Sequence, residues 1–290
     1  MKFSRTLALL AIPAALSFAA CGGGSTGVSN AVGLQAQLRF VNGATDPAGA
    51  AVDVFFTSTG NTASTSALVP ALGYGMITDF GVQPVTAAQV LLRTPNTTTV
   101  LGSCAIPQPA NNELNTVVIV NSGVAGTLTC TEFQDFNYSA PGQYRVHDAA
   151  AIAAGATPTF SFGLTNGTAA PTFAVVGTAT FPGTFSANPQ LAAGAVGPNA
   201  AVGAGAVGFA VGANSQAGTT MNTIAQINAS QFVTPAFPTP SAVQPDAANT
   251  LPGGGFNNAS IFIIDCNAAT TPQGTACAAG VGLVGSFDSK

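Results

Sequence analysis

The chain of 290 residues is poor in positive charge and in histidine, with six Lys and Arg residues, one His and no Trp. Nucleic-acid sites need clusters of Lys or Arg that neutralise phosphates, so the composition excludes that class of protein. From Ala149 to Pro245 there is no Asp, Glu, Lys or Arg. Most acid–base, phosphoryl-transfer and metal chemistry uses such side chains. We therefore expect a protein that is not an enzyme and needs no cofactor.

The N-terminus has the three parts of an export signal. Lys2 and Arg5 precede an apolar stretch from Leu7 to Ala20, which is too short for a lasting membrane span. The ending Phe-Ala-Ala-Cys resembles a bacterial lipobox, in which cleavage leaves an N-terminal cysteine that carries lipid. Residues 1–20 are thus predicted to be a lipoprotein signal peptide and Cys21 the lipidated residue.

The residues after Cys21 agree with an anchored protein. The sequence CGGGSTGVSN is rich in Gly and Ser, and a flexible tether is predicted over residues 21–36. Gly22 stands where an acidic residue would redirect sorting, so by resemblance to Gram-negative lipoproteins we expect the outer membrane if the host has one. Ordinary cleavage near Ala20, with Cys21 as a plain thiol, is the alternative.

Four further cysteines indicate disulfides. An even number in an exported chain favours two bridges, and three connectivities are open. The pairs Cys104–Cys130 and Cys266–Cys277 are favoured because each stays within one half of the chain. A metal site is disfavoured, since no Cys-x-x-Cys spacing or nearby His accompanies them.

Short runs of β-forming residues separated by Gly, Pro, Asn and Ser predict an all-β protein. We expect two tandem antiparallel β-sandwiches of Greek-key type, one over residues 37–136 and the other over 137–290. The second contains a low-complexity insertion at about 190–256, rich in Gly and Ala and then in Pro. Its Gly-rich part is predicted either to form a hairpin or, because ordering glycine is costly, to be disordered.

An internal repeat supports this division. The stretch beginning QLRFVNGATD at Gln37 aligns with QYRVHDAAAI at Gln143, which pairs Arg39 with Arg145. Near the end of each half, TVVIVNS (116–122) resembles IFIIDCN (261–267). The repeat indicates two copies of one fold.

The motifs LRFVNGATDPAGAAVDVFF, LGYGMITDFGVQPV and LNTVVIVNSG resemble a family called domain of unknown function 4397. The resemblance covers residues 37–122 and, more loosely, 143–167 with 259–268. It implies β-sandwich domains, often in tandem, in exported bacterial proteins without an established activity. The second copy departs from the pattern at Thr159, which stands where Asp53 would match.

Few residues are candidates for chemistry. His147 is predicted to be a solvent-facing strand residue, since no nucleophile or base accompanies it. Asp46, Asp53 and Asp79 fit no calcium loop, and a metal site is not expected. Because cations are scarce, a structural bridge between Arg39 and Asp53 on adjacent strands is predicted.

These observations lead to one hypothesis and one alternative. We expect a lipid-anchored envelope protein with a structural, adhesive or binding role, held to the membrane by its N-terminal lipid. The alternative is a surface module that binds a carbohydrate or a peptide, as a carrier or sensor subunit. A concave pocket lined by aromatic and Asn side chains would favour the alternative.

Overall fold

The fold was analysed in a computed structural model of the chain. It describes residues 35–46, 51–58, 60–63, 65–84, 88–106, 114–135, 144–151, 159–165, 170–181, 183–184, 208–213, 220–228, 231–232, 250–251, 255–256, 258–267, 277 and 280–288.

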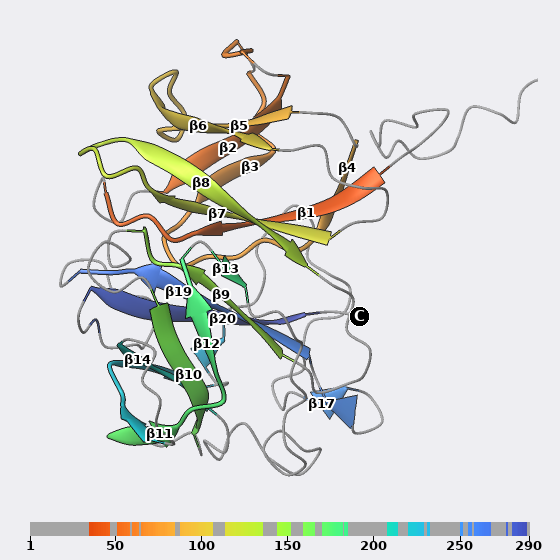
Figure 1. Ribbon diagram of the computed structural model, residues 1–290. Coiled ribbons are helices and arrows are strands. Elements are labelled where there is room, and N and C mark those ends of the chain that lie inside the picture. The colour runs from red at the N-terminus through yellow and green to blue at the C-terminus, as the bar shows by residue number, and fades with distance from the viewer. Residues whose placement is uncertain are drawn as a thin grey trace, which may run out of the picture.

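The described chain is built from β-strands, as the sequence predicted (Figure 1). Eight strands of the N-terminal half form one sheet in the order β3-β2-β5-β6-β8-β7-β1-β4. Their bounds are β1 (Gln35–Asn42), β2 (Val52–Thr57), β3 (Val69–Leu72), β4 (Gly81–Pro84), β5 (Ala88–Arg93), β6 (Val100–Ile106), β7 (Leu114–Asn121) and β8 (Leu128–Asp135).

This sheet folds over itself into two layers. The layers meet where β6 and β8 share one parallel bridge, between Gly102 and Leu128. A Cβ atom at Gly102 would lie 1.8 Å from the carbonyl oxygen of Leu128, so only glycine permits the approach. The core between the layers alternates along each strand and includes Phe40, Val54 and Ile119.

The C-terminal half forms a second sandwich from separate sheets. One sheet has the order β13-β9-β19-β20, the other β12-β10-β14-β16, and two-stranded sheets pair β11 with β15 and β17 with β18. Their bounds are β9 (Tyr144–Ala149), β10 (Thr159–Thr165), β11 (Thr172–Ala174), β12 (Gly177–Thr180), β13 (Gly183–Thr184), β14 (Gly208–Ala213), β15 (Thr220–Asn222), β16 (Ala225–Asn228), β17 (Thr250–Leu251), β18 (Gly255–Phe256), β19 (Asn258–Asp265) and β20 (Val281–Asp288).

Part of the predicted low-complexity insertion belongs to this sandwich. Residues 208–213 form β14, which lies between β10 and β16, so for them the structure shows a strand instead of disorder. Phe209 and Val211 of this strand pack in the core beside Phe160 and Phe162. Most of the rest of the insertion lies outside the described residues.

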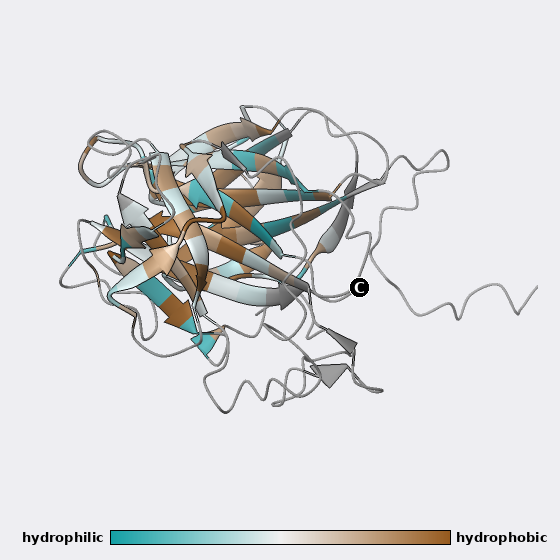
Figure 2. Ribbon diagram, turned by 60° about the horizontal axis from the view of Figure 1, so that its bottom comes forward, coloured by the Kyte–Doolittle hydropathy of each residue, from teal (hydrophilic) through white to brown (hydrophobic). Residues whose placement is uncertain are grey.

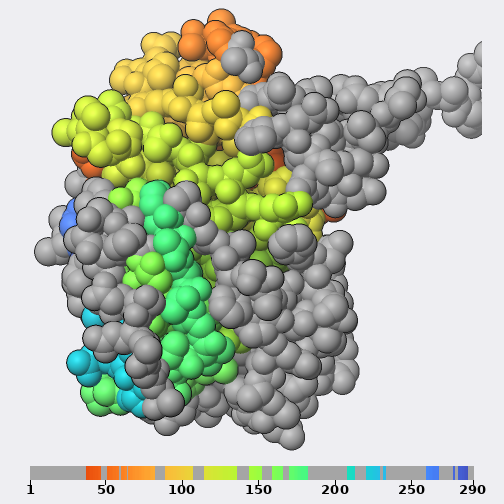
Figure 3. All heavy atoms as spheres, in the orientation of Figure 1, coloured from red at the N-terminus to blue at the C-terminus, as the bar shows by residue number. Residues whose placement is uncertain are grey.

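The two sandwiches stack face to face, which gives four sheet layers (Figure 1). In the space-filling view the described residues of the N-terminal half lie above those of the C-terminal half (Figure 3). The layer of β7 and β1 meets the layer of β9 and β19, and a separate apolar cluster fills the space between them. Within the described residues, every strand pair joins strands of the same half. A domain boundary near residue 136 stays a prediction.

Stacking explains why the middle strands are buried on both faces. All six residues of β9, and all of β7 except its first, are buried. Hydropathy colouring shows hydrophilic segments among the packed strands (Figure 2). Arg39, Asp135 and His147 are polar residues whose side chains are buried between the halves.

Candidate functional site

The polar residues between the halves follow from strand alternation. Along β1, Leu38 and Phe40 enter the core of the N-terminal half, so Arg39 points the other way, toward the C-terminal half. On β9, Tyr144 and Val146 enter the second core, which turns Arg145 and His147 toward the first half. We call the buried polar residues at this junction the seam: Arg39, Thr116, Asp135, Arg145, His147 and Ser260.

One carboxylate holds the seam together. Asp135, at the end of β8, lies 3.4 Å from Nη2 of Arg39 and 3.2 Å from Nη1 of Arg145. Its side chain is fully buried, and those of the two arginines are 2% and 3% exposed. Asp135 belongs to the N-terminal half and Arg145 to the C-terminal half, so this ion pair joins the halves.

Two hydroxyl groups complete the network. Nε of Arg39 donates to Oγ1 of Thr116 at 2.6 Å, and Nε of Arg145 donates to Oγ of Ser260 at 3.0 Å. Nη2 of Arg39 also donates to Oγ of Ser260 at 2.6 Å. Ser260 thus accepts from an arginine of each half.

Arg39 is further enclosed by aromatic rings. Its guanidinium carbon lies 4.5 Å from the ring centre of Phe80 and 5.2 Å from that of Phe262. Cation–π contacts of this kind stabilise a desolvated guanidinium.

His147 lies inside the seam, and the prediction that it faces solvent is wrong. Its side chain is fully buried, with Nε2 2.9 Å from Oδ1 of Asp135. Its ring stacks on Phe262, with centres 5.1 Å apart, and tilts against Phe133 at 4.7 Å. The sheet of the N-terminal half covers the face of β9 that carries His147 and that would otherwise be exposed to water.

The ionisation of the seam follows from its surroundings. Burial would raise the pKa of Asp135, but Arg39, His147 and Arg145 together outweigh it and hold that pKa well below its usual range. Burial lowers the pKa of His147, Asp135 opposes this, and both arginines add to the lowering. The two arginines thus favour the carboxylate form of Asp135, and burial favours the neutral form of His147.

The strand registers give a repeat alignment that differs from the predicted one by one residue. Arg39 stands opposite Thr116, and Arg145 stands opposite Ser260. If the arginines are equivalent, Thr116 matches Ser260 and not Ile261. The same shift matches Asn121 with Asp265, which the alignment of TVVIVNS with IFIIDCN does not.

Equivalent residues of the two halves also meet. Nδ2 of Asn121 donates to Oδ2 of Asp265 at 3.1 Å. The hydroxyl of Tyr74 donates to the backbone oxygen of Asp265 at 2.6 Å. Together with the apolar cluster, these bonds link the halves beyond the seam.

Asn42, the last residue of β1, and Asp148, the next-to-last residue of β9, make the same backbone contact. Oδ1 of each accepts the backbone N–H of the residue two positions on, Ala44 or Ala150, at 3.2 Å. Nδ2 of Asn42 also donates to the oxygen of Leu72. Burial and the nearby Asp265 carboxylate raise the pKa of Asp148 to about 8, against the opposing bond from Ala150.

The predicted bridge between Arg39 and Asp53 does not form, because β1 and β2 lie in different layers of the sandwich. Asp53 instead accepts the backbone N–H groups of Ala71, at 2.7 Å, and Asn96, at 2.9 Å. These are the two described non-glycine residues with positive φ, 48° and 59°. Asp53 therefore fixes two residues of positive φ, one within β3 and one in the turn between β5 and β6, and its role is structural.

We expect Asp53→Ala to lower the free energy of unfolding by roughly 2–4 kcal/mol, because two charge-assisted hydrogen bonds are lost. Asp53→Asn, which keeps one acceptor oxygen, should cost about half as much. Urea unfolding followed by circular dichroism measures both. A loss below about 0.5 kcal/mol for Asp53→Ala would contradict this role.

The structure pairs the four cysteines as the sequence favoured. Cys104 of β6 bonds Cys130 of β8, and Cys266 bonds Cys277, with Cα–Cα distances of 5.7 and 5.8 Å. Cys21, the predicted signal peptide and the predicted tether up to Leu34 lie outside the described residues.

Neither a metal cluster nor a membrane helix is found in the described part of the chain. There, no three His, Cys, Asp or Glu side chains are grouped to hold a metal ion, and Asp46, Asp53 and Asp79 do not come together. Nor does any helix in that part have the length and hydropathy to span a bilayer.

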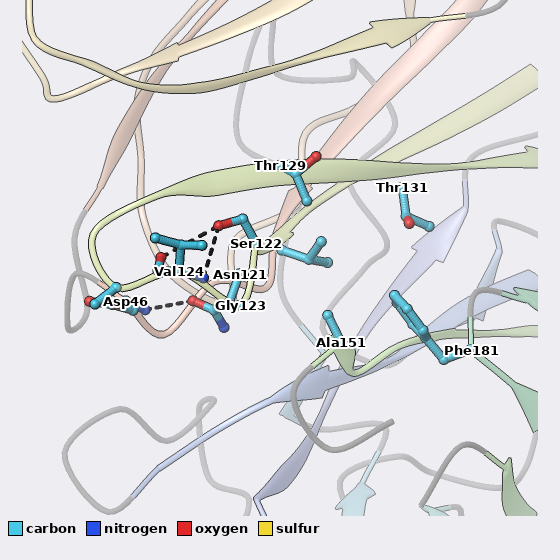
Figure 4. A pocket seen from close by; sticks show the side chains of 11 residues that line it. Asp46, Asn121, Ser122, Gly123, Val124, Thr129, Thr131, Ala151 and Phe181 are labelled. Carbon is cyan, nitrogen blue, oxygen red and sulfur yellow. Dashed lines mark hydrogen bonds between the residues drawn. The ribbon is translucent and has the colours of Figure 1, made fainter. Parts of the chain in front are cut away.

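A pocket of about 680 Å³ opens at one end of the junction (Figure 4). Thr129 and Thr131 of β8 form one wall, while Ala151 and Phe181 of the C-terminal half lie opposite them. The loop from Asn121 to Ala125, together with Asp46, closes the end. Its volume is within the range of about 300–1,000 Å³ typical of small-molecule sites.

Little in the sequence points to Asp135 or Ser260. Asp135 ends the alternating stretch TCTEFQD, in which Thr129, Thr131 and Phe133 share its face. That alternation is typical of a strand half exposed to water. Only the stacking of a second sandwich turns this face into a buried one.

Comparisons with known proteins place few limits on function. No family model matches the chain, and no curated protein matches it. Among solved structures, one that is similar is the family 26 carbohydrate-binding module CBMbc of Eubacterium rectale Amy13K, in complex with maltoheptaose. The similarity covers 81% of this chain and 99% of that one, at 11% identity and a TM-score of 0.21. At that TM-score the similarity carries no argument about this chain.

Proposed function

We propose that this chain is a lipid-anchored protein of the cell envelope with a structural or binding role and no catalytic activity. The observation that carries the proposal is the position of its most reactive groups. The single histidine and the carboxylate beside it are fully buried between the halves. Groups in that position bind the halves to each other and have no access to a substrate.

The anchor is supported by the N-terminal sequence. A positive segment, an apolar stretch and the lipobox-like ending at Cys21 precede a sequence rich in Gly and Ser. The two disulfide-bonded pairs agree with folding outside the cytoplasm, where such bonds persist. Attachment to the outer membrane, in a host that has one, remains part of the proposal, as does kinship with domain of unknown function 4397.

Metabolic labelling with an alkyne-bearing fatty acid tests the anchor. We expect the wild-type protein to carry the label and Cys21→Ala to carry none, because the thiol is the attachment point. Ser25→Ala, four residues along the same tether, is the matched control and should be labelled like the wild type. Label retained in Cys21→Ala would overturn the lipoprotein proposal.

A binding role is the second candidate, and the pocket at the junction favours it. The pocket combines an aromatic ring with several hydroxyl and amide side chains. Sites for small ligands share this mixture of apolar walls and a few polar groups. The structural role and the binding role are compatible, since the seam sets the spacing of the pocket's two walls.

A further inference from the structure

We propose that the pocket at the open end of the junction binds a neutral saccharide. The inference rests on the proposed non-catalytic binding role and names the ligand class for it. It starts from β8, whose face toward the C-terminal half runs from Asp135 through Phe133 to Thr131 and Thr129. The first two are buried between the halves, and the two threonines continue the same face into the pocket.

The threonines supply hydrogen-bonding groups that no described residue of the chain uses. Thr129 and Thr131 are partly exposed, and within the described chain their side-chain hydroxyls have no hydrogen-bond partner. Being two residues apart on one strand, they lie about 7 Å from each other along the wall. A hydroxyl both donates and accepts, so such a pair matches the hydroxyl groups along the edge of a sugar ring.

The opposite wall is apolar. Phe181 and Ala151 face the threonines across the pocket. Val120 also lines it and belongs to the apolar cluster between the halves. An aromatic ring offers a flat surface for the C–H face of a pyranose. Ligands with an apolar face and a hydroxyl-bearing edge fit this pairing of walls.

The charge of the residues that line the pocket disfavours anionic ligands. The described residues that line the pocket include one carboxylate, Asp46, and neither Lys nor Arg. Oδ2 of Asp46 accepts the backbone N–H of Gly126 at 2.8 Å, which fixes the carboxylate at the rim. A phosphate or a uronic acid would meet repulsion there without a compensating cation from these residues.

Saturation-transfer difference NMR on the purified full chain, with maltose, cellobiose and chitobiose as probes, tests the proposal. At least one disaccharide should bind, with Kd below about 10 mM. Phe181→Ala should weaken that binding about tenfold, and the near-isosteric Thr131→Val at least about threefold. Thr172→Val, on exposed β11 away from the pocket, is the matched control and should bind like the wild type.

Several results would overturn the saccharide site. They are failure of all three disaccharides to bind, equal binding by wild type and Thr131→Val, or binding of the cation tetramethylammonium in place of the sugars. Circular dichroism establishes that each variant is folded. Absence of the fatty-acid label from the wild-type protein, or its retention in Cys21→Ala, would refute the anchor but leave these measurements unaffected, so the two proposals fail separately.

Discussion

Asp135→Asn is expected to lower the free energy of unfolding by about 3–5 kcal/mol at pH 7. The carboxylate is fully buried and contacts Arg39, Arg145 and His147. An amide of the same shape removes the negative charge while the two guanidiniums remain desolvated. Removing one charged partner of a buried ion pair lowers stability for this reason, even where the intact pair adds little net stability.

Glu132→Gln is the matched control for that measurement. Glu132 lies on the same strand, but its side chain is partly exposed and alternates to the opposite face. The change removes the same charge, and we expect it to cost less than about 1 kcal/mol. Guanidinium unfolding followed by circular dichroism measures both variants. Equal, small losses would show that Asp135 does not hold the halves together.

The second large effect is an expected gain in stability. The change in the free energy of unfolding caused by Asp148→Asn should be more favourable at pH 8 than at pH 4, by roughly 3–6 kcal/mol. Burial and the Asp265 carboxylate raise the pKa of Asp148 from 3.8 to about 8, so the folded state holds a proton that the unfolded state releases. The stability from this group is complete below pH 4 and is lost as pH rises through about 8. Asparagine does not titrate, so the variant keeps its stability over this pH range at this position.

The other half provides a reciprocal variant. Asn42 at the end of β1 and Asp148 near the end of β9 each accept the backbone N–H group two residues on. Asn42→Asp should therefore introduce a loss of stability above pH 4 that the wild type lacks at this position. Unfolding free energies at pH 4.5, 6 and 8 for the three proteins measure the slopes. Parallel slopes in all three would refute the protonated state of Asp148.

Local patterns in the sequence predicted much of the fold. Alternating apolar residues located β1, β2 and β9, and the position of each cysteine within its half predicted the disulfide pairing. Arg39 and Arg145, which the repeat aligns, both contact Asp135. These features depend on neighbours along one strand or within one half.

Those local patterns did not predict the candidate site. The sequence YRVHDA alternates polar and apolar residues, as an exposed strand does, yet every residue of β9 is buried. Whether the polar face of a sheet meets water or another sheet depends on contacts between residues far apart in the chain, such as Arg39 and Ser260. The strand Gly208–Ala213 was not predicted for a related reason. Its small residues suggest disorder in the sequence, but in the structure they allow close packing between sheets.

Calorimetric unfolding tests most directly the claim that the seam makes one unit of the two halves. Differential scanning calorimetry of the purified full chain compares the measured enthalpy with the van't Hoff enthalpy of the transition. The buried ion pairs predict a single transition in which the two enthalpies agree. Two separated transitions, or one half unfolding while the other stays folded, would contradict the account.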